Sequence, residues 1–340
     1  MIRPDLADMP AYVPGTRQPD ALKLSSNEVT TPPLPAAVEA MAEAAAEANR
    51  YPDMFATDLK EALAEHLGLP AGQVTVGCGS SALCQQLVQI TAAPGDEVIF
   101  PWRSFEAYPI FVQIVGAKPV AVPLLADGRH DLDAMAAAIT GRTRLIFLCS
   151  PNNPSGTVIS QEEFDSFMAR VPEDVVVGLD EAYFEFNRNE DAVVGTEAVT
   201  RYPNVVGLRT FSKAYGLAGV RIGYAFGAPE LITALDKMAI PFGVSSVAQA
   251  GALASLDAAD ELLERTEETV VQRDRVAAAV GARHSEGNFV WLPGVDAKDM
   301  ADRLAEQGVL TRAFPEGLRI SVTTEDEADQ FLAAWRSAGL

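Results

Sequence analysis

The segment with the most chemical information is residues 209–224, which centres on Lys213. The lysine follows an apolar run, and Thr210 and Ser212 precede it with small hydroxyl groups. Desolvation at a strand end lowers the pKa of a lysine and frees its amine to form a Schiff base. Thr210, Ser212 and Arg221 could then bind an anion, with the arginine as a two-pronged donor. The alternative is a surface lysine and a structural arginine beside a glycine turn.

A second candidate is Asp180, at the end of another apolar run in residues 175–183. Ligands of parallel sheets bind in the loops that follow the carboxyl ends of the strands. A carboxylate there can keep a heterocyclic nitrogen protonated, and Tyr183 could reach a phenolic oxygen on the same ring. The alternative is an aspartate that caps a helix and a tyrosine that packs in the core.

Two loops could complete such a site. Residues 150–156 form a turn rich in Pro, Asn and Gly, from which Asn153 can present an amide donor. Residues 76–82 form a glycine turn that opens a helix, and the free N–H groups of a helix start bind phosphate. Taken alone, ordinary turn structure explains either loop.

The order of these four motifs points to one shared site. Each motif follows an expected parallel strand, so all four open at the same edge of one sheet. A protonated ring nitrogen, a phenolic oxygen, a phosphate and an imine-forming carbon together describe pyridoxal phosphate. The sequence therefore predicts a pyridoxal phosphate site with Lys213 as the point of covalent attachment.

The elements that must position these motifs form an α/β pattern. Up to residue 240, apolar runs alternate with helical segments, which predicts a mostly parallel sheet buried on both faces. The expected strands are 74–76, 97–100, 145–149, 175–179, 205–208 and 222–226. The expected helices include 36–48, 82–91, 104–114, 132–138 and 161–169.

The pattern changes after residue 240 and predicts a smaller α+β unit. One long helix is expected over 247–280. Strands at 288–292 and 318–322 and helices at 297–306 and 327–335 follow it. We therefore divide the chain into an N-terminal arm (1–35), a large cofactor-binding domain (36–240) and a small C-terminal domain (241–340).

Composition limits the partners and the location of the protein. Among 340 residues, 47 acidic and 26 basic side chains give a formal charge of −21. This balance argues against nucleic acids and anionic membranes, which both need clustered Lys and Arg. Three cysteines fit neither a disulfide framework nor a zinc pattern, so we expect free thiols and no metal. We find no apolar signal segment, and we expect a cytoplasmic protein.

The motifs resemble those of fold-type I pyridoxal-phosphate aminotransferases, specifically the histidinol-phosphate aminotransferase family. The resemblance covers essentially the whole chain, with further family marks at residues 23–28, 49–52 and 318–320. Residues 12–15, 102–108 and 288–293 are similar to the branch of actinobacterial aromatic amino acid (phenylalanine) aminotransferases.

The resemblance implies a role for each candidate. Lys213 matches the lysine that bonds the cofactor and moves the substrate Cα proton, and Asp180 matches the partner of the ring nitrogen. Phe105 stands where many relatives stack a tyrosine on the ring. The residues that match those bonding the ring oxygen are Asn153 and Tyr183. The residues that match the phosphate cup are Ser80, Ser81, Thr210, Ser212 and Arg221.

The resemblance also implies a dimer and a substrate site. Tyr51 resembles the tyrosine that reaches the phosphate of the neighbouring subunit, so a homodimer would complete the active site. Arg319 resembles the arginine that pairs with the substrate α-carboxylate. Without the resemblance, Arg319 would be interpreted as a solvent-facing arginine on an alternating strand. The other substrate-binding candidates are Asn27, Tyr12 and Arg312.

The substrate is predicted from the segment around Arg312 and Arg319. These are the only cations between residues 311 and 319, while Phe314 and Glu316 favour an apolar side chain over a second anion. We predict amino transfer between phenylalanine, tyrosine or tryptophan and 2-oxoglutarate by a ping-pong mechanism. Histidinol phosphate is the alternative substrate. Two other classes stay open, namely a decarboxylase or lyase on the same scaffold and a non-catalytic module that binds a nucleotide or effector.

Overall fold

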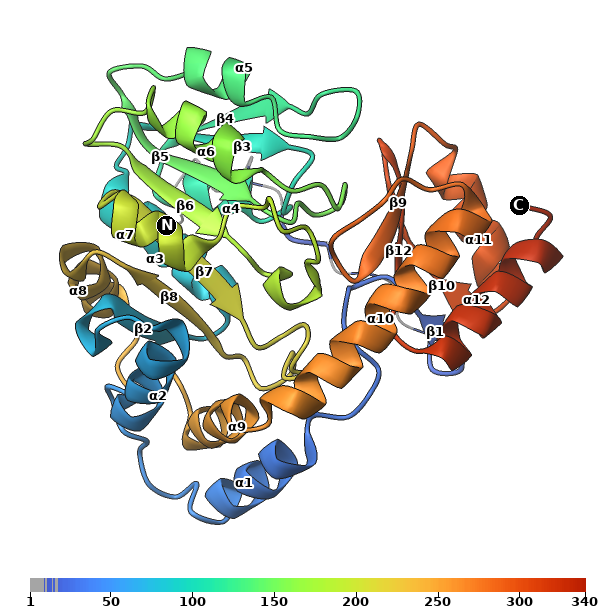
Figure 1. The fold of residues 1–340 in the computed structure, drawn as a ribbon, viewed down its shortest axis with the longest axis horizontal. Coiled ribbons are helices and arrows are strands. Elements are labelled where there is room, and N and C mark those ends of the chain that lie inside the picture. Colours follow the sequence, from blue (N-terminus) through green and yellow to red (C-terminus); the bar gives the residue numbers. More distant parts are fainter. Residues whose placement is uncertain (1–8, 10, 14, 16–17) are drawn as a thin grey trace, which may run out of the picture.

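The computed structural model describes residues 9, 11–13, 15 and 18–340, which form a large and a small unit (Figure 1). The large sheet contains β2 (Val74–Gly77), β3 (Glu97–Trp102), β4 (Lys118–Pro123), β5 (Thr143–Cys149), β6 (Val176–Asp180), β7 (Val205–Thr210) and β8 (Gly223–Gly227). The helices around it are α1 (Pro35–Ala46), α2 (Thr57–Leu67), α3 (Ser80–Thr91), α4 (Tyr108–Ile114), α5 (Leu132–Ala137), α6 (Gln161–Met168), α7 (Gly195–Arg201), α8 (Pro229–Met238) and α9 (Ser246–Leu256). Short 3-10 turns lie at Ala71–Gln73 and Phe184–Phe186.

The small unit is built on a three-stranded antiparallel sheet. Its elements are α10 (Ala259–Val280), β9 (Phe289–Pro293), α11 (Ala297–Glu306), β10 (Val309–Leu310), β11 (Arg312–Phe314), β12 (Gly317–Ser321) and α12 (Glu325–Ser337). The N-terminal strand β1 (Leu22–Lys23) pairs in parallel with β10. Within the described ranges, no helix is both long and apolar enough to cross a membrane.

The large sheet has the order β2-β8-β7-β6-β5-β3-β4, and β8 runs in the direction opposite to the other six strands. The predicted α/β class with a mostly parallel sheet is therefore confirmed. Because β8 separates β2 from β7 and is antiparallel to both, β2 runs parallel to β5, β6 and β7. The four strands that precede the chemical motifs consequently end at the same edge of the sheet.

Both faces of the sheet are buried, as the uninterrupted apolar runs predicted. On β5, Ile146 and Leu148 belong to one hydrophobic core, whereas Leu145 and Phe147 belong to the core on the other face. All four side chains have no exposed surface. Side chains of a strand alternate between faces, so an apolar run of this length can only be accommodated between two helical layers.

Two details of the expected elements were wrong. Strand β4 was not predicted, because its two prolines and half-exposed pattern are those of an edge strand rather than a buried one. The single helix expected over 247–280 is two helices, α9 and α10, separated at residues 257–258. Neither a glycine nor a proline marks this break. It arises because α9 packs against α1 and α2, whereas α10 leads into the small unit.

The N-terminal segment connects the two units. Leu24 is buried in the core of the small unit together with residues of β9, β12 and α12. The chain then crosses to the large unit, where α1 packs on α9. We call residues 22–28 the strap, because they lie between the small unit and the loops that follow the large sheet (Figure 1). The domain boundaries at residues 35 and 240 stay predictions.

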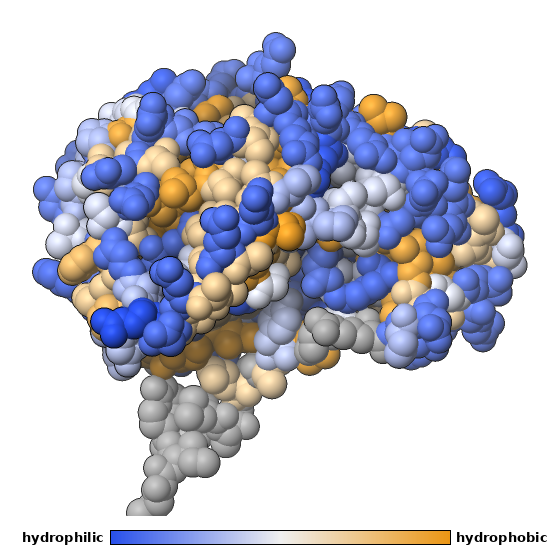
Figure 2. All heavy atoms as spheres, turned by 90° about the horizontal axis from the view of Figure 1, so that it is seen from below, coloured by the Kyte–Doolittle hydropathy of each residue, from blue (hydrophilic) through white to orange (hydrophobic). Residues whose placement is uncertain are grey.

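The surface differs between the units. Seen from below, the small unit is mostly hydrophilic, whereas apolar residues gather over the large unit (Figure 2). Several large apolar side chains of the large unit are exposed, including Tyr51, Met54, Phe55, Ile240 and Phe242. Apolar groups of this size at one surface are typical of a protein interface.

Candidate active site

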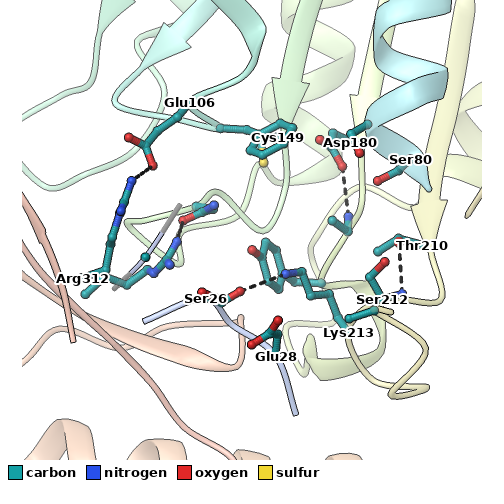
Figure 3. A pocket seen from close by; sticks show the side chains of 18 of the residues that line it. Ser26, Glu28, Ser80, Glu106, Cys149, Asp180, Thr210, Ser212, Lys213 and Arg312 are labelled. Carbon is teal, nitrogen blue, oxygen red and sulfur yellow. Dashed lines mark hydrogen bonds and ion pairs between the residues drawn. The ribbon is translucent and has the colours of Figure 1, made fainter. Parts of the chain in front are cut away.

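A cavity of about 250 Å³ lies between the two units at the edge where β2, β5, β6 and β7 end. Side chains from the strap, the large sheet and the small unit all point into it (Figure 3). The predicted residues that line it are Tyr12, Ser80, Ser81, Phe105, Asn153, Asp180, Tyr183, Thr210, Ser212, Lys213, Arg221, Arg312 and Arg319. Of the predicted set, Asn27 and Tyr51 are not among the lining residues.

Asp180 is the last residue of β6, and its carboxylate is buried. Burial raises its pKa from 3.8 to about 6, although a hydrogen bond from Tyr108 and one from a backbone N–H oppose that rise. The Tyr108 hydroxyl donates to Oδ2 at 2.6 Å, and the N–H of Ala182 donates to Oδ1 at 3.2 Å. The carboxylate thus has a fixed orientation and a high affinity for a proton or a cationic N–H donor.

Tyr108 was not predicted to have this role. The Tyr108 ring is fully buried and lies parallel to Phe147, with ring centroids 4.5 Å apart. Phe105 of the same segment does line the cavity and meets the Tyr108 ring edge-on. Sequence spacing shows that both aromatics lie near α4, but it does not reveal which hydroxyl reaches Asp180.

Lys213 follows β7 and is held against the strap. Its Nζ donates to the carbonyl oxygen of Ser26 at 3.4 Å (Figure 3). Burial and, to a smaller extent, the nearby cations Arg319 and Arg221 together lower the pKa of Lys213 from 10.5 to about 8, although Glu28 and Asp180 oppose this change. A substantial share of the amine is therefore unprotonated in mildly alkaline solution, as covalent or proton-transfer chemistry requires.

Hydroxyl groups and one arginine form an anion-binding cradle at the start of α3. A guanidinium nitrogen of Arg221 lies 3.5 Å from Ser81 Oγ, and a second donates to the carbonyl of Ala218 at 2.8 Å. Thr210, the last residue of β7, and Ser212 in the loop after it line the same cavity. Gly79 has a φ of +79°, and a Cβ there would lie 2.5 Å from the Arg221 guanidinium. Glycine is therefore required for the arginine to reach the helix N-terminus.

Arg319 lies on the small-unit side of the cavity. Its guanidinium donates to Asn153 Oδ1 at 2.6 Å and to the carbonyl of Ser25 at 2.7 Å. The interpretation of Arg319 as a solvent-facing residue is wrong, because the strap and the loop of Asn153 contact its guanidinium and the residue is only 6% exposed. Its buried Nε has no partner within the part of the chain that the structure describes. Such a donor suits a carboxylate ligand.

Arg312 reaches the cavity from β11 but is already paired. One of its nitrogens donates to Glu106 Oε2 at 2.9 Å and to the carbonyl of Val13 at 2.9 Å (Figure 3). Tyr12, the residue before Val13, lines the same part of the cavity and is half exposed. Glu106 was not predicted as a site residue, because a single acidic residue in a loop has no distinguishing pattern.

Two predicted residues are placed outside the cavity. Tyr51 is 83% exposed and stacks on Phe242 with ring centroids 4.7 Å apart. Asn27 is buried in the strap, where its amide nitrogen donates to the hydroxyl of Tyr183 at 3.0 Å. The strap also places Ser25, Ser26 and Glu28 at the cavity. Residues 23–28 carry a mark of the family, but the sequence pattern does not reveal which of their groups face the site.

Known proteins match this chain over nearly its whole length. Residues 19–334 match the family model of aminotransferase class I and II. The chain is 69% identical to an aromatic amino acid aminotransferase of Corynebacterium efficiens over 338 residues, 99% of both chains. It is 54% identical to one of Nocardia farcinica over 341 residues, 97% of this chain and 95% of that one. A solved structure, histidinol-phosphate aminotransferase from Sinorhizobium meliloti in complex with pyridoxal-5'-phosphate, is 33% identical, with a TM-score of 0.91 and coverage of 99% and 97%. The predicted transaminase is confirmed: the chain belongs to the class I and II aminotransferase family.

Proposed function

We propose that this transaminase exchanges amino groups between phenylalanine, tyrosine or tryptophan and 2-oxoglutarate, with pyridoxal phosphate as its cofactor. One observation carries the proposal. The cavity brings a buried carboxylate, a lysine of lowered pKa and an anion cradle to a single sheet edge. The curated relatives at 54–69% identity are aromatic amino acid aminotransferases.

The residues present fit pyridoxal phosphate. Asp180 would bind the ring nitrogen, because a carboxylate whose pKa is raised by burial is best stabilised by a cationic N–H donor. The phosphate would lie in the cradle of Ser81, Thr210 and Arg221 at the start of α3. When bound, the cofactor withdraws electrons from the substrate Cα and so acidifies its proton.

The chain's own residues would then bind the substrate and move one proton. Arg319 binds the α-carboxylate through its guanidinium, which Asn153 and Ser25 hold in place. Nζ of Lys213 takes the proton from the substrate Cα, since its lowered pKa leaves part of the amine unprotonated. Asp180 keeps the ring nitrogen protonated. The amino donor and the oxo acid acceptor use the same groups in turn, which gives ping-pong kinetics.

The pair of Arg312 and Glu106 supports an aromatic amino donor. An aromatic side chain can lie beside this pair without breaking it, whereas a phosphate would have to compete with Glu106 for Arg312. 2-Oxoglutarate must compete in the same way, with its second carboxylate. The histidinol-phosphate enzyme of known structure is 33% identical to this chain, well below the aromatic relatives. Because competition for Arg312 applies to 2-oxoglutarate as well, it is this difference in identity that makes histidinol phosphate the less favoured substrate.

We also propose that the protein works as a homodimer in which Tyr51 reaches the neighbouring subunit's phosphate site. The exposed side chains of Tyr51 and Phe242 stack on each other, and Met54, Phe55 and Ile240 border one hollow beside them. Tyr51→Phe is expected to weaken cofactor binding but to leave the mass in light scattering unchanged. A monomer at micromolar concentration would contradict the dimer, and unchanged cofactor affinity would contradict the role of Tyr51.

The proposed location is the cytoplasm. Cys78, Cys84 and Cys149 are free thiols in the structure. Free cysteines are usual where the environment is reducing. Fractionation of cells that produce the protein, followed by an assay of each fraction, tests this location.

A substrate panel tests the activity. The purified holoenzyme is assayed with 2-oxoglutarate and, in turn, phenylalanine, tyrosine, tryptophan and histidinol phosphate. We expect kcat/KM for phenylalanine to exceed that for histidinol phosphate by at least about tenfold, the ratio that 1.4 kcal/mol of transition-state binding produces. A faster reaction with histidinol phosphate would contradict the proposal. Release of carbon dioxide in place of amino transfer would contradict it as well.

A further inference from the structure

Asn27 lies in the strap, one residue after the carbonyl that accepts from Lys213, yet it does not line the cavity. Its side chain is 1% exposed, and its φ is +53°. A buried asparagine in the left-handed region is held there by the groups that it bonds. Asn27 bonds to both units of the protein: to Ser321 on β12 and to Tyr183 beyond β6.

The hydrogen bonds around Asn27 define the direction of each donor. The backbone N–H of Asn27 donates to Ser321 Oγ at 2.8 Å. The serine hydroxyl has only one proton, which it donates to Asn27 Oδ1 at 2.8 Å. The amide oxygen is therefore on the serine side, and the amide nitrogen donates to Tyr183 Oη at 3.0 Å. Both ends of the Asn27 amide are therefore bonded, the oxygen to Ser321 and the nitrogen to Tyr183.

The hydrogen bond from Asn27 determines where the hydroxyl proton of Tyr183 points. Its oxygen accepts from Asn27, so its own hydrogen points away from Asn27, and Tyr183 lines the cavity. The ring is held as well, since it packs edge-on against Phe289 of β9 at 5.0 Å. Burial raises the pKa of Tyr183, while Arg319 and the bond from Asn27 act in the opposite direction. The hydroxyl thus stays protonated at neutral pH and remains a donor.

We infer that Ser321 and Asn27 form a relay that makes the Tyr183 hydroxyl a hydrogen-bond donor toward an anionic oxygen bound in the cavity. Asn27 is then a positioning residue that acts through Tyr183, rather than a substrate ligand. The inference rests on the proposed function, in which that oxygen is the phenolic oxygen of the cofactor. Arg319 and Ser321 lie two residues apart on β12, so the strand that binds the substrate carboxylate also holds the relay.

The relay predicts a spectroscopic effect that does not depend on turnover. A donor from Tyr183 stabilises the anionic ring oxygen, and loss of the Asn27 bond makes Tyr183 a weaker donor. Asn27→Gly removes the side chain and tolerates the positive φ. We expect it to raise the apparent pKa of the visible absorption band of the holoenzyme by about half a unit to one unit, which is the shift that one ordinary hydrogen bond gives.

A double-mutant cycle tests whether Asn27 changes the apparent pKa of the band through Tyr183. Tyr183→Phe alone should raise the same apparent pKa, and Asn27→Gly should add no further shift in the Tyr183→Phe background. The control is Thr30→Val, because Thr30 also bonds the chain between the units, to Thr323 at 3.2 Å, but does not bond Tyr183. We expect this control to leave the band unchanged.

The outcomes separate the relay from the proposed function. Equal shifts by Asn27→Gly with and without the Tyr183 hydroxyl, or no shift in either background, would overturn the relay. Should Asn27→Gly fail to fold, Ser321→Ala, which frees the amide to rotate, replaces it in the same cycle, with a shift expected only when Tyr183 is present. If the wild-type protein forms no visible band with pyridoxal phosphate, the proposed cofactor is wrong and so is the relay. If the wild-type band is normal and Tyr183→Phe shifts its apparent pKa but Asn27→Gly does not, the relay is refuted and the proposed function stands.

Discussion

Replacement of Tyr108 by phenylalanine tests how the protein controls the charge of Asp180. The substitution keeps the ring that stacks on Phe147 and removes only the hydroxyl that donates to Asp180 Oδ2 at 2.6 Å. A hydrogen bond to a charged group contributes about 1.5–3 kcal/mol, so its loss should raise the pKa of Asp180 by at least about one unit. The value would move from about 6 in the wild-type protein to about 7 in the variant.

This shift predicts a pH-dependent loss of cofactor affinity. At pH 6 the ionised share of Asp180 would fall from about one half to about one tenth, and at pH 7 from about nine tenths to about one half. If binding requires the carboxylate, the Kd for pyridoxal phosphate should rise about fivefold at pH 6, about twofold at pH 7 and hardly at all at pH 8.5. Titration of the apoprotein at each pH, expressed as the ratio of variant to wild type, cancels the ionisation of the cofactor itself.

The control for this titration is Tyr224→Phe. Tyr224 is also fully buried but does not line the cavity, so its replacement should leave the ratio near one at every pH. A ratio for Tyr108→Phe that stays the same between pH 6 and pH 8.5 would refute the reasoning, because the hydroxyl would then act on something other than the ionisation of Asp180.

Three further substitutions test other parts of the site by their effect on stability or binding. Asp180→Asn should stabilise the apoprotein by up to about 3 kcal/mol at pH 8 and by little near pH 4. Because the pKa of Asp180 is about 6 in the folded protein and 3.8 without burial, its ionisation lowers the free energy of unfolding as the pH rises from about 4 to above 6, which unfolding at both pH values would show. Gly79→Ala should weaken cofactor binding by at least about tenfold in a titration, because a Cβ at a φ of +79° would displace the Arg221 guanidinium; unchanged affinity would contradict the cradle. Glu181→Ala should lower the free energy of unfolding by about 3–5 kcal/mol in denaturant, since it removes the carboxylate that buried Arg209 contacts at 2.9 Å. A loss below about 1 kcal/mol would show that this ion pair is not needed for stability.

The sheet and its chemical edge could be predicted from local patterns. The runs before Ser80, Asn153, Asp180 and Lys213 are continuously apolar, and such runs become strands buried on both faces. The motif that follows each run must then open at the carboxyl end of a strand. Parallel pairing brings these ends together without any knowledge of the packing between helices.

Elements that depend on tertiary packing could not be predicted. Strand β4 forms at an edge, where pairing with β3 compensates for the exposed half of its pattern. The break between α9 and α10 has no breaker residue, because the two helices end where they begin to pack on different units. Both features follow from contacts between segments that are far apart in the sequence.

The same limit applies to the site. The motifs identified Lys213 and Asp180, but the groups that adjust their pKa values come from elsewhere: Tyr108 from the start of α4, and Arg319 from β12. The paired state of Arg312 depends on Glu106, which is more than 200 residues away in the chain. A sequence reveals which side chains carry chemistry more readily than it reveals their partners.

The most direct test of the account concerns the amine of Lys213. The holoenzyme is reduced with borohydride, digested, and its peptides are analysed by mass spectrometry, which locates any pyridoxyl group on a single side chain. We expect one modified lysine, Lys213, and no visible band or amino transfer in Lys213→Ala. A pyridoxyl group on another lysine, or full turnover in Lys213→Ala, would contradict it.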